Sequence, residues 1–202
     1  MVYQVWSSHN NLMLNTAKTV ETTVNFRKSP PALSALTILD RTVVAVESCK
    51  FLGTTITRDL KWDSNISSII KRALQRMCFL RQLRKFNLPQ ELMVWFCTAI
   101  IESIITTSIT VWGSSATKHD LHRLQRIIRS AERTTGVKLP TLLELHASRT
   151  RKRAEKISTD PSHAGHHLFQ LHPSGRRFSQ MRIRTSRLQR SFFPQAITLL
   201  NS

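Results

Sequence analysis

The hydrophobic pattern divides the chain into a short β-rich beginning and a longer helical part. Residues 20–26 alternate apolar and polar positions, as a half-buried strand does. Residues 36–46 form a pattern of two short strands around Asp40 and Arg41. Residues 49–57 form a third β-rich run, in which Gly53 permits a bulge or a close backbone approach. These runs predict a small antiparallel sheet at the N-terminus.

From Ser64 onwards the apolar residues recur with a helical period. Asp63 or Ser64 is the expected N-cap, because short polar side chains accept hydrogen bonds from the first free amides of a helix. Lys71, Arg72 and Arg76 turn away from the apolar face. That face consists of Ile66, Ile69, Ile70, Ala73, Leu74, Met77 and Leu80.

Residues 92–112 are apolar on nearly every side and approach the length of a membrane span. Glu102 lies at the centre of this stretch, and a charged side chain there costs about 2.5–3.5 kcal/mol on insertion scales. Threonine and serine residues also interrupt its second half. We therefore expect a buried core helix that breaks near Thr106. A membrane-associated or interaction protein built on residues 92–112 is the alternative.

A third helix is predicted over residues 118–135, with Gly136 as the residue that ends it. Thr141 and Glu144 form a capping-box pattern, which predicts the start of a fourth helix. That helix leads into a strongly basic tail, expected to be partly disordered alone and ordered on a partner. The expected fold is α+β and mostly α: residues 1–62 with the sheet, 63–136 as a helical bundle, and 137–202 as a basic helix and tail.

The charge of the chain favours a phosphate-bearing partner. Thirty lysines and arginines face twelve acids, which gives a net charge of +18, and RNA or DNA is the expected partner ahead of an anionic membrane.

The N-terminus shows no secretory pattern. Three cysteines without a CxxC pair favour a reducing compartment, so an intracellular location, nuclear or cytoplasmic, is expected.

Signatures of catalysis are absent from the sequence. Two-metal phosphoryl transfer needs converging carboxylates, and here the acids are isolated. There is also no P-loop and no nucleophile elbow. The histidines at 163, 166, 167 and 172 lack a helical frame and a nearby cysteine, so a polar loop is a better interpretation than a metal site. We expect no enzyme activity, no cofactor, no metal and no small-molecule substrate.

Four blocks, residues 10–26, 48–62, 70–89 and 124–136, resemble in order and spacing the end of a reverse transcriptase from a LINE-type non-LTR retrotransposon, and the likeness extends to residues 173–201. This resemblance implies that Lys18 is the motif lysine near the leaving pyrophosphate and that Phe51, Leu52 and Gly53 belong to the primer grip. The following helices would form the thumb.

The family's catalytic aspartates precede these blocks, so the resemblance implies a catalytically inactive fragment that binds an RNA–DNA hybrid or a similar duplex. Its basic helices would contact the phosphates. The residues expected to do so are Lys71, Arg72, Arg76, Arg123, Arg126, Arg129, Arg133, Arg151, Lys152 and Arg153.

A second and weaker resemblance covers residues 64–105, which are similar to the N-terminal segment of the AlkB-homologue tRNA hydroxylase and methyltransferase family. It would imply iron, 2-oxoglutarate and methyl transfer. The sequence lacks the His-x-Asp pair and the glycine-rich turn that these reactions need.

Overall fold

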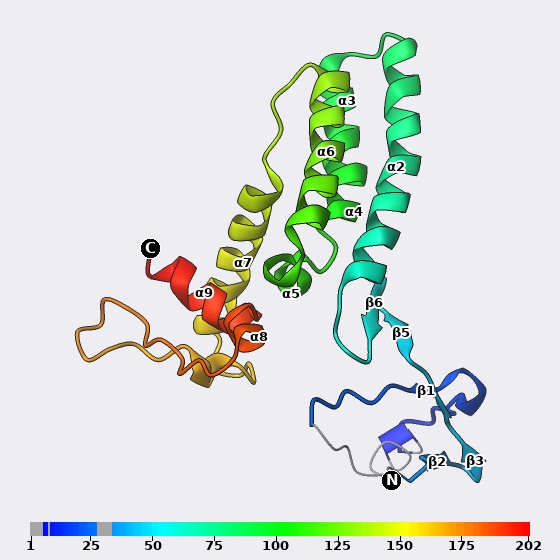
Figure 1. The fold of residues 1–202 in the computed structure, drawn as a ribbon, viewed down its shortest axis with the longest axis vertical. Coiled ribbons are helices and arrows are strands. Elements are labelled where there is room, and N and C mark those ends of the chain that lie inside the picture. Colours follow the sequence, from blue (N-terminus) through cyan, green and yellow to red (C-terminus); the bar gives the residue numbers. More distant parts are fainter. Residues whose placement is uncertain (1–5, 8, 28–33) are drawn as a thin grey trace. The chain divides into compact units, whose positions relative to one another are not determined.

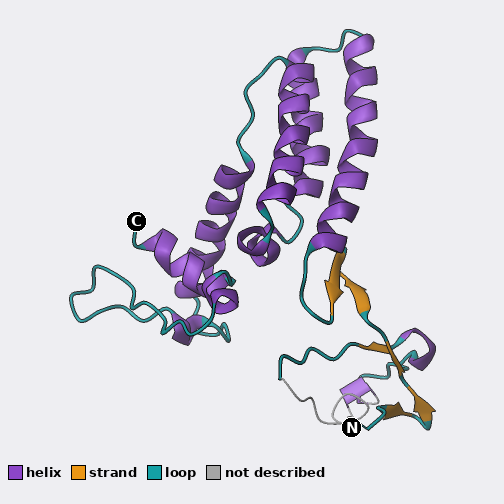
Figure 2. Ribbon diagram, viewed as in Figure 1, coloured by secondary structure: helices purple, strands orange, loops and turns teal. Residues whose placement is uncertain are grey.

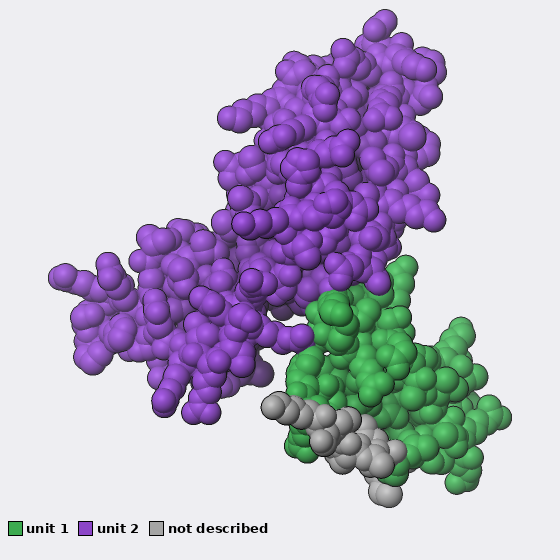
Figure 3. Space-filling model, viewed as in Figure 1, with its two compact units in different colours: residues 1–61 green, residues 62–202 purple. Residues whose placement is uncertain are grey.

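The computed structural model describes residues 6–7, 9–27 and 34–202. The chain forms two compact units, residues 1–61 and residues 62–202 (Figure 3). The α+β, mostly helical class is confirmed, and all the described strands lie in the first unit (Figure 2).

Unit 1 contains three separate strand pairs. β1 pairs with β4 in parallel, β2 with β3 antiparallel, and β5 with β6 antiparallel. The single antiparallel sheet expected from the sequence is therefore wrong, and only the first two residues of the strand predicted over 20–26 are in a strand. The bounds are β1 (Val20–Glu21), β2 (Thr37–Ile38), β3 (Arg41–Thr42), β4 (Val44–Ala45), β5 (Ser48–Phe51) and β6 (Thr54–Thr57), preceded by a 3₁₀ turn (Thr16–Lys18).

Both antiparallel pairs are hairpins with two-residue turns. Leu39 and Asp40 have φ values of 48° and 57°, and Leu52 and Gly53 have values of 45° and 81°. Two successive positive φ angles are the mark of a type I′ turn, whose twist matches that of the strands. Glycine adopts this left-handed conformation without strain, so Gly53 suits the turn. Leu52 has a side chain, and the same conformation costs it about 1–2 kcal/mol.

Helix α2 (Asp63–Lys85) buries the apolar face predicted for it, with one exception. Leu74 is 49% exposed, because it lies at the edge of the face, where no other helix covers it. The predicted capping by Asp63 or Ser64 is wrong. The N-cap is Trp62, which makes no side-chain hydrogen bond, and Asp63 is in the first turn, where its negative charge suits the helix dipole.

The long apolar stretch is a broken helix in the core. It comprises α3 (Gln90–Phe96), a π-helical segment (Cys97–Glu102), α4 (Ser103–Ile105) and, after a break, α5 (Ile109–Trp112) and a 3₁₀ turn (Gly113–Ser115). The buried residues recur at intervals of four: Met93, Cys97, Ile101, Ile105 and Ile109. Four residues overshoot one α-helical turn, so this stripe would drift around a regular helix. The wider π turn reduces that drift and keeps the stripe facing the core.

The break lies where the sequence predicts it, after Ile105. Ser108 has a positive φ of 52°, and side chains on either side of the break donate to main-chain carbonyls. The Thr106 hydroxyl donates to the Glu102 carbonyl at 2.8 Å, and Trp112 Nε1 donates to the Thr107 carbonyl at 2.7 Å. Among the described helices, none alone is long and apolar enough to cross a membrane, although residues 90–105 and 109–115, bent by 44°, pass that test as a pair.

Helix α6 (Lys118–Thr135) has the predicted bounds and ends at Gly136, whose φ is 74°. It packs beside α2, and the segment formed by α3 and α4 runs next to both helices (Figure 1). Helix α7 (Leu142–Ser158) begins with the predicted capping box: Thr141 Oγ1 accepts from the Glu144 amide at 3.2 Å, and the Glu144 carboxylate accepts from the Thr141 amide at 2.7 Å.

The basic tail folds against α7. A 3₁₀ turn (His166–Leu168), α8 (Ser186–Gln189) and α9 (Phe192–Leu200) follow it. Ala154 and Ile157 of α7 form a second apolar cluster with Phe169, Ala196 and Ile197. The aromatic residues thus give this part of the tail a small core, which the sequence analysis, resting on the arginines, did not anticipate.

Replacing the capping threonine, Thr141→Ala, is expected to destabilise the helical unit by about 1 kcal/mol, since the first free amides of α7 lose their acceptor. Urea unfolding followed by circular dichroism measures the change. Ser148→Ala, an exposed substitution on the same helix, is the matched control. Equal stability of the two variants would contradict a capping role.

Candidate nucleic-acid interface

The clearest basic surface is a row of three exposed arginines on α6: Arg126, Arg129 and Arg133. Their spacing of three and four residues places them on one side of the helix. In the part of the chain that the structure describes, none of these guanidinium groups forms an ion pair. We refer to these residues as the α6 arginine row. The opposite side of α6 is buried and consists of Leu124, Ile127, Ile128 and Ala131.

Arg123, which the sequence assigned to the same surface, has a different role. Its Nη1 lies 3.2 Å from Asp120 Oδ1, and Asp120 is only 5% exposed. Asp120 also accepts from the Thr117 hydroxyl at 2.7 Å. A nearly buried carboxylate needs a neighbouring positive charge, so Arg123 stabilises the start of α6 and is the least suited of the four to contact phosphate.

The three cations assigned to α2 differ in their surroundings. Lys71 and Arg76 are exposed, and the Arg76 guanidinium lies 5.6 Å from the centre of the Phe79 ring. Arg72 is partly buried, and its Nε and Nη2 have no hydrogen-bond partner among the described residues. Unpaired N–H groups shielded from water are costly, so Arg72 is a position where an anion would be stabilised.

The three basic residues assigned to α7, Arg151, Lys152 and Arg153, differ in whether they contact the rest of the protein. Arg151 Nη2 donates to the Leu199 carbonyl at 2.9 Å and therefore holds the end of α9. The Arg153 guanidinium lies 5.7 Å from the centre of the Phe192 ring. Lys152 is exposed and is the residue of this run best suited to an external anion.

Sequence reasoning missed three further cations near the C-terminal end of α2. Arg81 and Lys85 are exposed, and Arg84 Nη1 donates to the Arg133 carbonyl at 2.8 Å. This last hydrogen bond joins the ends of α2 and α6. These cations could have been predicted from the sequence, because basic residues are dense in the last turns of the predicted helix, where the helix dipole favours positive charge.

The residues predicted by resemblance to assist the primer lie in unit 1. Lys18 is exposed at the end of the 3₁₀ turn, and its amide donates to Asn15 Oδ1 at 3.2 Å. Phe51 and Leu52 are 63% and 84% exposed at the β5–β6 turn, beside Gly53. Apolar side chains presented in this way at a hairpin turn are available for contact with another molecule.

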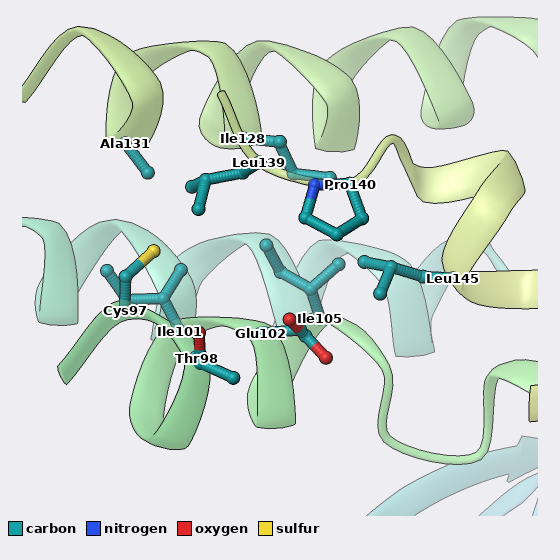
Figure 4. A pocket seen from close by; sticks show the side chains of 10 residues that line it. All are labelled: Cys97, Thr98, Ile101, Glu102, Ile105, Ile128, Ala131, Leu139, Pro140 and Leu145. Carbon is teal, nitrogen blue, oxygen red and sulfur yellow. The ribbon is translucent and has the colours of Figure 1, made fainter. Parts of the chain in front are cut away.

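A small apolar cavity lies between α6, the loop after it and the π-helical segment (Figure 4). Its volume is about 20 Å³, which is room for a single water molecule. Cys97 lines it, and burial together with the nearby Glu102 raises the pKa of this thiol to about 11. A protonated thiol is a poor nucleophile, so the cavity has neither the space nor the reactivity of an active site.

Among the described residues, no group of three or more histidine, cysteine or acidic side chains could hold a metal ion. His163 Nδ1 accepts a hydrogen bond from the Gly165 amide at 3.0 Å, and His166 Nδ1 lies 3.2 Å from the Ile157 carbonyl. Both histidines thus have local partners in the loop after α7.

Residues 62–103 match one family model, described as the N-terminal part of alkylated DNA repair protein alkB homolog 8. The matched segment comprises α2, α3 and the π-helical turn. It is well under half of the chain, so the match shows a local similarity. Neither the curated proteins nor the solved structures contain a match to this chain.

The buried thiol of Cys97 is expected to react with iodoacetamide at pH 8 at least about a hundredfold more slowly than the exposed Cys78, because little of it is ionised below its raised pKa. Peptide mass spectrometry of a labelling time course measures both rates. In urea the two rates should converge. Equal rates in the folded protein would show that Cys97 is accessible.

Proposed function

We propose that the helical unit, residues 62–202, binds the phosphate backbone of nucleic acid through the α6 arginine row and the exposed cations of α2. The protein would act without catalysis, cofactor or metal, inside the cell, on an RNA–DNA hybrid or a similar duplex. The observation that carries the proposal is the α6 arginine row, which is exposed and has no acidic partner among the described residues.

The geometry of the row suits a helical phosphate backbone. Residues 126 to 133 span about 10 Å along the helix at 1.5 Å per residue, comparable to the axial rise of three base pairs, at about 3.4 Å each, in a duplex. Lys71, Arg81 and Lys85 add exposed charge on the neighbouring helix. Binding of this kind draws its free energy from released counterions and reads no sequence.

The resemblance of the four sequence blocks to a LINE-type reverse transcriptase gives the proposal a biological setting. In that setting the helical unit is the thumb, and the β5–β6 hairpin, with Phe51 and Leu52 exposed at its turn, contacts the end of a primer strand. The hairpin itself was expected from the sequence, and an exposed apolar turn is compatible with positioning a strand. Lys18 would keep its place in the motif without a catalytic role.

The family match over residues 62–103 supports a second candidate, a segment similar to the N-terminal part of an AlkB homologue. The activities associated with such proteins require iron and 2-oxoglutarate. Thermal stabilisation of the protein by both ligands together would favour this candidate, whereas nucleic-acid binding in their absence favours the first.

Replacing two members of the row, Arg126→Gln with Arg129→Gln, is expected to weaken binding to a labelled RNA–DNA hybrid and to lower the slope of log Kd against log salt by about 2, since each lost phosphate contact removes about one unit. Fluorescence anisotropy across a salt series measures both effects.

The matched control is Arg58→Gln with Lys61→Gln, which removes the same charge from unit 1. Both residues already have acidic partners, at 3.1 Å in each case, so the salt slope should remain that of the unaltered protein. Equal slopes for the two double variants would show that α6 is not part of the binding surface.

A further inference from the structure

A second and larger cavity lies where α5, the 3₁₀ turn after it, α6, α7 and α9 meet. Its volume is about 260 Å³, enough for a single-ring molecule. The cavity has mostly apolar walls with three polar side chains, and no charged residue lines it. The lining residues that matter here are Trp112, Leu121, Leu143, Ser114, His146 and Gln195.

The imidazole of His146 is held against the 3₁₀ turn by a close contact. A Cβ atom at Gly113 would lie 2.5 Å from His146 Cδ2, so the ring approaches this closely only because residue 113 is glycine. Nε2 lies on the same edge of the ring, 3.3 Å from the Ser114 hydroxyl. The Nδ1 atom lies on the opposite edge of the ring from these contacts.

The hydrogen bonds of His146 define its tautomer. Thr150 is 1% exposed, and the one hydrogen-bond partner of its hydroxyl among the described residues is His146 Nε2, at 3.5 Å. The Thr150 hydroxyl can donate to Nε2 only when Nδ1 carries the ring hydrogen, and we assign that tautomer to His146. Burial lowers the pKa of His146, which keeps the ring neutral at pH 7. Nδ1 is therefore a hydrogen-bond donor without an acceptor among the described residues.

Gln195 supplies the complementary group. Its Nε2 donates to the Gln189 carbonyl at 2.9 Å, which fixes the orientation of the side-chain amide. Among the described residues, the one hydrogen bond of this side-chain amide is made by Nε2, which leaves Oε1 available as an acceptor. The cavity thus offers one donor, on His146, and one acceptor, on Gln195, between apolar walls.

We propose that this cavity binds a neutral, flat ring that carries an amide or lactam group, the chemical class to which benzamide and the lactam bases uracil, thymine and guanine belong. The carbonyl of the ligand would accept from His146 Nδ1, and its N–H would donate to Gln195 Oε1. The absence of a charged lining residue disfavours an anion. A few polar groups in a mainly apolar cavity are typical of small-molecule sites.

Binding, and not catalysis, is the role that the geometry supports. Ser114 and His146 resemble a nucleophile and its base, but a working pair needs a third group that orients the imidazole through Nδ1. No described residue accepts from Nδ1. The site is independent of the proposed nucleic-acid surface, since none of the basic residues of that surface lines the cavity.

The test uses the full chain and benzamide, followed by saturation-transfer NMR, with toluene and benzoate as comparison probes. Benzamide is expected to bind more tightly than either. Leu143→Trp places a larger side chain at a 69% exposed position on the cavity wall and should weaken benzamide binding at least about tenfold. Leu171→Trp, at a 54% exposed position that does not line the cavity, should leave binding unchanged.

A third variant tests the polar contact. His146→Phe should remove the preference for benzamide over toluene, which amounts to about fivefold for one hydrogen bond. No binding of benzamide to the unaltered protein, or equal binding to the Leu143→Trp variant, would overturn the proposal.

Free uracil and a short oligouridine distinguish the source of the ring. Weakening of both by Leu143→Trp would indicate that the cavity also takes a base from a nucleic-acid chain. Weakening of free uracil alone would indicate a free ligand. Either result supports the cavity as the site, and binding of neither probe would exclude nucleobases from the class and overturn that part of the proposal.

Discussion

The burial of one side of α6 against α2 is the constraint on which the basic surface depends. In a helix of 3.6 residues per turn, burying Leu124, Ile127 and Ile128 directs Arg126, Arg129 and Arg133 to the opposite side. A rotation of α6 that hid these arginines would place unpaired charges among apolar side chains at a cost of several kcal/mol each. Packing in the core therefore sets the direction of the charges, and the hydrogen bond from Arg84 to the Arg133 carbonyl holds the end of the helix in that orientation.

The π-helical segment has a related effect on the other half of the unit. Because it keeps the stripe from Met93 to Ile109 facing the core, Glu102 emerges at the edge of the bundle, where Arg149 of α7 reaches it at 3.2 Å. After this stripe comes the buried Trp112, just before the turn against which His146 packs. The position of α7, and with it the larger cavity, follows from how the apolar stretch bends. In a straight helix, the ion pair of Glu102 with Arg149 and the packing of His146 against the turn would both change.

Patterns that act locally could be predicted from the sequence, and those that depend on distant partners could not. Helix α6 was predicted because one apolar stripe and a terminal glycine define it, and the capping box of α7 because its two residues are three positions apart. The parallel pairing of β1 with β4 joins segments with no common pattern. The structural roles of Arg123 and Arg151 depend on acceptors that no count of charges reveals.

The arginine row and the larger cavity also differ in how far the sequence predicts them. The arginine row was visible as a basic face, whereas His146, Ser114 and Gln195 come from three elements and share no sequence motif. The limit of prediction from sequence is clearest in unit 1. Its β-forming residues suggested a sheet, but among its described residues Val43 is the one buried apolar side chain. Two-stranded pairs without a core are marginal in water. The described apolar core, and with it most of the stability of the chain, therefore lies in the helical unit.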